Sequence, residues 1–284
     1  MAEVQSTKPF AKFEWMIAWR YIRAKRAEGG VSVMTWISLI GVTLAVFALI
    51  ATLAVRSGFR AEFIDTIAGA NAHVSVVQPG SVIAEFEDVA DQVRAVEGVQ
   101  SVAPLIRGQA MAAGRGRIGL ADIYGIRLDD LKQSDAIVQS ERTVGNIDDL
   151  PNGIAVGSAL ASNLGLGIGD RIELTTRSGV ATPMGQSTRR NAYEIVYIFS
   201  TGRFQIDEVR VYLPFDVAQL VLNRDGVADE LEVRLDDLNQ SEVLKQVIAN
   251  AAGPGMWAYS WQDRVGRFLR ALTIEAVSYT HLRA

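Results

Sequence analysis

The chain of 284 residues contains no cysteine and only two histidines, His73 and His281. Without thiols it has no disulfide, thiolate metal site, iron–sulfur cluster or cysteine nucleophile. Two histidines are too few for a His-rich metal centre. We expect His73, at the start of a predicted strand, to be structural, and we predict no metal site in this chain.

Nucleotide-binding motifs are also missing. The sequence has no Gly-Lys pair and therefore no Gly-x-x-x-x-Gly-Lys-Ser/Thr loop, which excludes a P-loop ATPase site from this polypeptide. The glycine-rich run 165–170 precedes a predicted strand, whereas a dinucleotide site needs a helix N-terminus after its loop. We predict that this run is a turn.

No catalytic constellation emerges from the remaining polar residues. Three adjacent carboxylate pairs, at 129–130, 148–149 and 236–237, are predicted to be solvated loop acids and not a glycosidase pair or a calcium site. The net charge of −4 gives no support for nucleic-acid binding. We therefore predict a protein that is not an enzyme and that has no cofactor of its own.

Charge is distributed unevenly along the chain. Residues 1–30 carry six Lys/Arg and three acids, residues 31–55 carry no charge, and residues 57–284 have a net charge of −8. The uncharged run 33–55 is 23 residues long, enough for an α-helix to cross the hydrocarbon core of a bilayer. It explains the positive mean hydropathy of +0.16.

The apolar run is predicted to be a retained anchor. A cleaved signal peptide has a shorter apolar region and a small-residue cleavage site, whereas this run ends in Arg56-Ser57-Gly58-Phe59-Arg60. The basic flank 20–26 places the N-terminus in the cytoplasm and the acidic body outside. Before the span, residues 10–21 are typical of an amphipathic helix at the cytoplasmic interface.

The acidic body predicts an α+β domain. Strand, helix and strand are expected at 73–77, 85–96 and 99–103, and again at 230–235, 241–251 and 256–260. In the last of these helices Val243, Leu244, Val247 and Ile248 are expected to face inward. Between the two units lies a strand-rich insertion, roughly 114–228, with its clearest strands at 154–156, 171–176, 193–199 and 208–213 and short helices at 158–164 and 215–222.

Two segments suggest contacts with partners. Residues 177–191 are polar, contain three arginines, and are expected to form a long hairpin tip or loop. An exposed Met184 beside Pro183 would offer an adaptable contact to a partner protein, although a plain mobile loop is the alternative. Arg56 lies at the outer membrane surface, where simple snorkelling is the alternative role.

Several ordered motifs resemble the lipoprotein-releasing permeases of the LolC/LolE family, within the MacB-like class of ABC transporter permeases. The motifs are FEWMIAWRYIR at 13–23, ISLIGVTLAV at 37–46, Ser57-Gly58-Phe59, Val102-Ala103-Pro104, Leu164-Gly165 with Gly169-Asp170, Thr182-Pro183-Met184-Gly185, and Trp261-Gln262-Asp263-Arg264. The resemblance covers about residues 13–276.

The resemblance implies a MacB-like periplasmic core made of a porter-like part with an inserted strand-rich part. It implies a permease subunit of an inner-membrane ABC complex that releases lipoproteins and passes them to the periplasmic chaperone LolA. ATP and Mg²⁺ would bind a separate LolD-like subunit, and a second permease copy or paralogue would complete the complex. In the LolC branch a hairpin, the hook, binds the chaperone; its matching residues here are Thr182, Pro183, Met184, Gly185, Gln186, Arg189 and Arg190.

The chain departs from the family pattern at two places. The family often has Met at the position of Arg56, beside Phe59, where the side chain lines an acyl-chain pocket; Arg56 would instead contact a polar headgroup region. The last residues, 277–284, resemble a translated adapter sequence, and we expect a C-terminally truncated gene product. The expected division is a basic head at 1–30, a membrane helix at 31–56, a periplasmic domain at 57–265, the start of a stalk at 266–276 and the artefactual tail.

Two other functions stay open. Another MacB-class or FtsX-class permease could export a small molecule or transmit mechanical force. If the present C-terminus is real, a single-pass anchored periplasmic sensor or binding module is the alternative. A neighbouring gene for a LolD-like and a LolA-like protein would favour lipoprotein release, and an outer-membrane channel partner would favour export.

Overall fold

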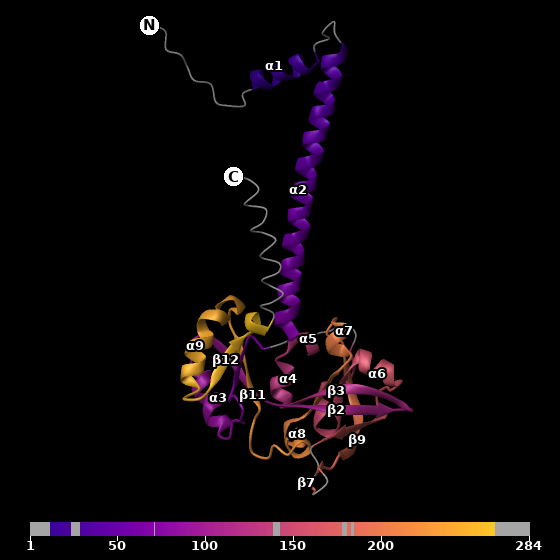
Figure 1. Ribbon diagram of the computed structural model, residues 1–284, viewed down its shortest axis with the longest axis vertical. Coiled ribbons are helices and arrows are strands. Elements are labelled where there is room, and N and C mark those ends of the chain that lie inside the picture. Colours follow the sequence, from indigo (N-terminus) through magenta and orange to yellow (C-terminus); the bar gives the residue numbers. More distant parts are fainter. Residues whose placement is uncertain are drawn as a thin grey trace. The chain divides into compact units, whose positions relative to one another are not determined.

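The computed structural model of the chain describes residues 12–23, 29–70, 72–138, 143–177, 181–182 and 185–264. It divides into two compact units, Met1–Phe63 and Ile64–Ala284 (Figure 1). The first unit is helical, and the second contains all the described strands. Each unit has its own organisation.

The first unit consists of α1 (Lys12–Arg23) and most of α2 (Gly29–Ala70). The membrane helix expected at 31–56 continues beyond its predicted end, to Ala70, and no proline interrupts it. Within α2, Val33–Gly58 is long and apolar enough to cross a membrane, with none of its window buried in the protein. The apolar surface of α2 therefore lacks a protein core to cover it among the described residues.

Two hydroxyl groups of this apolar stretch bond to their own helix. Thr43 Oγ1 donates to the Leu39 carbonyl and Thr52 Oγ1 to the Ala48 carbonyl, both at 2.7 Å. These bonds satisfy polar groups where no water is available, which a membrane-spanning helix requires.

The second unit is built on one mixed sheet with helices packed against it. Its strands are β1 (Val74–Val77), β2 (Val99–Gly114), β3 (Arg117–Ile126), β4 (Val144–Gly145), β5 (Ile154–Gly157), β6 (Arg171–Thr176), β9 (Arg189–Phe199), β10 (Arg210–Pro214), β11 (Glu230–Leu235) and β12 (Trp257–Ser260). A separate two-stranded hairpin joins β7 (Ala181–Thr182) to β8 (Gly185–Gln186). The helices are α3 (Phe86–Arg94), α4 (Leu128–Lys132), α5 (Asp135–Val138), α6 (Ser158–Leu164), α7 (Phe204–Asp207), α8 (Phe215–Leu222) and α9 (Ser241–Ala251), with 3₁₀ turns η1 (Ile147–Asn152) and η2 (Leu238–Gln240).

The two strand–helix–strand units predicted from the sequence are present and interleave in one sheet. Their strands lie in the order β12-β1-β11-β2, all antiparallel. In Figure 1, α3 and α9 lie together beside these strands. The mixed α/β architecture expected for this part of the chain is therefore confirmed.

The strands between these units form a closed circuit. Strand β2 leaves β11 at Leu105 and pairs with β3 from Ile106 onward. The pairings then run from β3 through β10, β5, β9 and β6 and return to β2. Such closure removes most of the free strand edges of this region.

Helix α3 buries the apolar face that its spacing predicts. Phe86, Val89, Ala90 and Val93 are buried against the sheet. Helix α9 was predicted to bury four residues, but Val243 is 74% exposed and Val247 is 47% exposed. The buried face of α9 is therefore narrower than predicted. Ser241 and Ile248 make its buried contacts, and Leu244 is only partly covered.

The glycine-rich run 165–170 is a turn, as predicted. Gly165 ends α6 in the left-handed conformation, with φ of 70°, and β6 follows without an intervening helix. The Asp170 carboxylate accepts a hydrogen bond from Gly167 N at 2.9 Å, and this bond together with Arg115 lowers the pKa of Asp170. The side chain closes its own turn and leaves no phosphate cradle.

His73 has a structural role, in agreement with the sequence prediction. Its Nδ1 accepts a hydrogen bond from Leu235 N at 3.0 Å, which ties the start of β1 to the end of β11. Burial and the neighbouring charge of Arg234 lower the pKa of His73 below its ordinary value. The folded state therefore favours the neutral imidazole.

This pKa direction predicts how stability depends on pH. The unfolded chain binds a proton at His73 near pH 6.5 while the folded chain resists it, so the free energy of unfolding falls as the pH drops below about 6.5. We expect His73→Gln, which keeps a hydrogen-bond acceptor, to lose less stability between pH 7.5 and 5.5 than the unmodified chain. The measurement is the denaturant midpoint at both pH values; equal losses in the two proteins would contradict it.

Candidate functional site

The predicted hook region rests on two paired strands. Strand β6 pairs with β9 in antiparallel register from Arg171↔Glu194 to Thr176↔Arg189. Beyond this pair the small hairpin β7–β8 is registered Ala181↔Gln186 and Thr182↔Gly185. Figure 1 places β7 at the margin of the second unit, beyond β9. The backbone of this segment is therefore carried outward by the sheet.

The structure describes the predicted hook residues to different extents. Thr182 lies in β7, and Gly185 and Gln186 lie in β8. Pro183 and Met184, predicted to form the contact tip, lie outside the described residues. The positions of the hook residues thus come together through the backbone pairing of β7 with β8.

The two arginines at the base of the hook are both at the start of β9. Arg190 Nε lies 3.0 Å from Glu173 Oε1 on β6. Arg189 Nη1 donates to the backbone carbonyl of Leu220 in α8. Both guanidinium groups are thus held by neighbouring elements at the place where the chain enters and leaves the hook.

The predicted lipid-contact residues lie on α2. The side chain of Arg56 is exposed near the end of the apolar stretch, and the next residue, Ser57, donates from its hydroxyl to the Ala54 carbonyl at 3.0 Å. The backbone of Phe59 continues the same helix, while its side chain lies outside the described residues. The hook and these helix residues belong to separate units.

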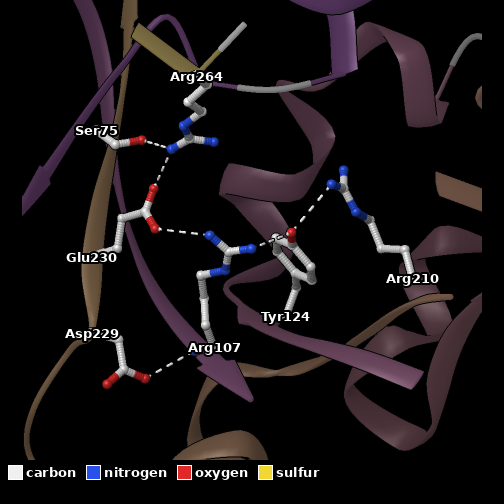
Figure 2. A network of polar contacts seen from close by, with 7 residues as sticks. All are labelled: Ser75, Arg107, Tyr124, Arg210, Asp229, Glu230 and Arg264. Carbon is white, nitrogen blue, oxygen red and sulfur yellow. Dashed lines mark hydrogen bonds and ion pairs between the residues drawn. The ribbon is translucent and has the colours of Figure 1, made fainter. Parts of the chain in front are cut away.

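A second site, centred on the buried carboxylate of Glu230, was not anticipated from the sequence. Its side chain is 3% exposed, yet it carries a charge that must be compensated. Arg264 Nη2 lies 2.6 Å from Oε1, and Arg107 Nη1 lies 3.3 Å from Oε2. Figure 2 shows the two guanidinium groups approaching the carboxylate from different segments.

The cluster extends beyond these ion pairs to both sides. Arg264 also donates to Ser75 Oγ on β1, and its guanidinium lies 4.8 Å from the centre of the Tyr259 ring. The backbone N–H of Arg107 donates to Asp229 Oδ2 at 2.9 Å. The cluster therefore connects β1, β2, β11 and the segment that follows β12.

Tyr124 links this cluster to the strand circuit. Its Oη accepts from Arg107 Nη2 at 2.7 Å and from Arg210 Nη2 at 3.2 Å, so two arginines converge on one phenol (Figure 2). Burial lowers the pKa of Arg210, but Tyr212 and Tyr124 outweigh this effect and the pKa lies above its ordinary value. Burial raises the pKa of Tyr212 to about 12. These groups form a polar core between the two halves of the unit.

Only a weak sequence signal pointed toward this cluster. The alternation in β11 places Glu230 and Glu232 on the face opposite the apolar Leu231 and Val233, which by itself is typical of a solvated strand face. Arg264 is part of a family-like motif, but its partner lies 34 residues away and Arg107 lies 123 residues from Glu230. Local spacing carries no information about such contacts.

Comparison with known proteins places the chain in a family. The family model described as MacB-like periplasmic core domain matches residues 35–251, which is most of the chain. The chain therefore belongs to the MacB-like periplasmic core domain family.

Curated relatives narrow this class to the LolC/LolE branch suggested by the sequence motifs. The chain is 29% identical over 242 residues to the lipoprotein-releasing system transmembrane protein LolC of Xylella fastidiosa, covering 84% of this chain and 58% of that protein. It is 25% identical to LolC of Neisseria meningitidis and 22% identical to LolE of Haemophilus influenzae, covering 92% of this chain and 64% of each relative. The chain thus spans about three-fifths of the length of these relatives.

Two solved structures of transporter domains also resemble the fold of this chain. The periplasmic region of MacB from Actinobacillus actinomycetemcomitans aligns with a TM-score of 0.47 and 11% identity, covering 74% of this chain and 98% of that chain. The extracellular domain of the transporter YknZ from Gram-positive bacteria aligns with a TM-score of 0.45 and 13% identity, covering 66% and 99%.

The Glu230 cluster generates a stability prediction. Glu230→Gln removes the charge that compensates two guanidinium groups, and breaking such a buried arrangement costs about 3–5 kcal/mol of unfolding free energy. The matched control is Asp91→Asn, which breaks the exposed Asp91–Arg94 pair and should cost less than about 1 kcal/mol. Denaturant unfolding of both variants measures the difference; equal and small effects would show that the buried carboxylate is dispensable.

Proposed function

We propose that this chain is the membrane-anchored periplasmic part of a permease subunit in an inner-membrane ABC complex that releases lipoproteins. One observation carries the proposal: a MacB-like core domain and an apolar helix long enough to span a membrane occur in one chain, whose relatives are named as lipoprotein-releasing system proteins. The subunit is a transport component and does not catalyse a reaction itself.

The energy source in this proposal is a separate subunit. The chain has no P-loop sequence, so ATP and Mg²⁺ would bind a LolD-like ATPase partner, and a second permease copy or paralogue would complete the complex. The basic residues 20–26 favour a cytoplasmic N-terminus, which places the second unit in the periplasm. Lipoprotein cargo and membrane lipid would then meet the subunit at the outer surface of the inner membrane, near Arg56 and Phe59.

The hook is the proposed contact with a LolA-like periplasmic chaperone. Pro183 and Met184 stand in the sequence between β7 and β8, and a methionine there would offer a flexible apolar side chain to a partner. Arg189, which follows the hairpin, adds positive charge that suits an acidic partner surface, whereas the charge of Arg190 is paired with Glu173.

The Glu230 cluster supports a mechanical role for the second unit. Arg264 follows β12 and is tied to Glu230, which is tied in turn to β2 through Arg107. A displacement of the chain after Arg264 would therefore pull on the junction between the two halves of the unit. In our proposal the ATPase moves the membrane segments and this junction transmits the movement toward the hook.

A photo-crosslinking experiment tests the chaperone contact. A photoreactive residue at Met184, in the full chain reconstituted in nanodiscs, should crosslink to purified LolA. The control carries the photoreactive residue at position 204, because Phe204 is also accessible, with 61% of it exposed. It should not crosslink, because it follows the end of β9 that lies about 30 Å of strand away from the hook.

The outcome separates the candidate functions. Equal crosslinking at both positions, or none at Met184, would rule out the hook assignment. The expected result is efficient crosslinking of LolA at Met184. In addition, Arg189→Glu should bind LolA with about tenfold weaker affinity, measured by biolayer interferometry.

A further inference from the structure

The tip of the β2–β3 ribbon leaves one strand edge open. The two strands are joined by a two-residue turn, in which Arg115 and Gly116 both have positive φ, 47° and 77°, typical of a tight hairpin. The ribbon is registered from Gly114↔Arg117 to Ile106↔Gly125. On its outer side β3 pairs with β10 only from Asp122 onward. Residues 117–121 therefore pair with no second strand among the described residues.

The hydrogen-bonding phase of β3 shows which groups lie at this edge. Outward-facing backbone groups alternate along an antiparallel pair. Asp122 N points outward, because it donates to the Val209 carbonyl at 2.7 Å. The next outward positions in the same phase are Leu120 and Ile118. Their N–H and C=O groups form the open edge.

The side chains at this edge are apolar and uncovered. Ile118 is 69% exposed, Leu120 is 55% exposed, and Met111, the cross-strand partner of Leu120, is 52% exposed. Natural edge strands are often protected by charged side chains, proline or a bulge. Residues 117–121 contain no proline and no bulge, and their one charged side chain, Arg117, lies at the end next to the turn. An accessible apolar edge of this kind is suited to strand addition by another polypeptide.

The same surface continues to the base of the hook. A groove of about 660 Å³ is lined on one side by Ile118 and Leu120 and on the other by Arg177 and Thr188, the residues that flank the hook. Met111 and Thr175, which are paired across β2 and β6, lie between them. A partner bound at the hook can therefore reach the edge without leaving the groove.

Charge around the groove specifies the partner further. Arg117 donates to the Asn163 carbonyl and Arg189 to the Leu220 carbonyl, while Arg177 is exposed; none of the three forms an ion pair with a carboxylate of a described residue. Three uncompensated guanidinium groups beside an apolar floor favour a ligand with apolar residues at its centre and carboxylates at its flanks.

We propose that β3 accepts an extended segment of the protein partner that the hook binds, as an added strand along residues 117–121. The segment carries apolar side chains at alternate positions, which cover Ile118, Leu120 and Met111, and acidic residues that meet Arg117, Arg177 and Arg189. This inference rests on the proposed chaperone contact and adds a second, backbone-mediated contact to it.

Hydrogen exchange tests the added strand directly. With the full chain in nanodiscs, saturating purified LolA should slow exchange of the Ile118 and Leu120 amides at least tenfold, because both N–H groups become hydrogen-bonded.

Leu120→Pro removes one outward donor, and Leu120→Lys places a charge on the groove floor; each should weaken LolA binding about tenfold. The matched control is Val144→Lys on the short strand β4, which is similarly exposed at 57% and should leave the affinity unchanged.

Several outcomes would overturn the inference. LolA that crosslinks at Met184 without protecting the two amides would mean that the hook acts alone. Absence of both crosslinking and protection would remove the proposed chaperone contact and the added strand together. Protection that appears without LolA and grows with the concentration of this chain would identify a second copy as the occupant. Vesicles of phosphatidylethanolamine and phosphatidylglycerol that reduce the exposure of Leu120 without slowing the amides would identify lipid.

Discussion

The buried carboxylate of Glu230 is the constraint on which the second unit depends. A carboxylate with 3% exposure is unfavourable unless ion pairs and hydrogen bonds replace its water, and two arginines from distant parts of the chain supply them. The requirement brings the end of the described chain at Arg264 to the same point as β2 and β11. The apolar strand faces would tolerate small displacements between these segments, whereas the short ion pairs tolerate few.

The arrangement of β2 follows from the same junction. This strand pairs with β11 up to Leu105 and with β3 from Ile106, so a single extended segment is shared by the interleaved units and the strand circuit. Arg107 lies just after the exchange of partners and binds Glu230 and Tyr124 together. A movement at Arg264 can thus pass into the strand that leads to the groove and the base of the hook. This continuity gives the proposed transport role a physical route that needs no flexible linker.

The closed strand circuit has a consequence for binding. The six strands of the circuit pair with one another, but β10 begins too late to cover residues 117–121 of β3, which leaves an exposed edge there. The adjacent groove and the hook base lie on the same surface. The places that can bind a partner are therefore those where the sheet leaves its own interactions incomplete, which is also where apolar side chains remain in contact with water.

Local periodicity in the sequence was sufficient to predict most of the elements. The uncharged run predicted the apolar stretch of α2, period-two alternation predicted β6 and β11, and helical spacing predicted α3, α6 and α8, because each of these patterns depends on neighbours within a few residues. The ordered motifs also predicted the MacB-like family. Burial was less predictable: Val243 and Val247 have core-like spacing in α9 but are exposed, since the width of the buried stripe depends on what packs opposite it.

Tertiary structure alone decided how these elements meet. The partners of Glu230 are separated from it by 34 and 123 residues, and the open edge of β3 exists only because β10 starts at Arg210 and pairs no earlier than Asp122. Neither fact leaves a local pattern in the chain, because ion pairing and strand register between distant segments depend on the path of the whole polypeptide. The sequence by itself determined an α/β protein with an apolar helix long enough to cross a membrane, and its family. The charged junction and the free strand edge came from the fold.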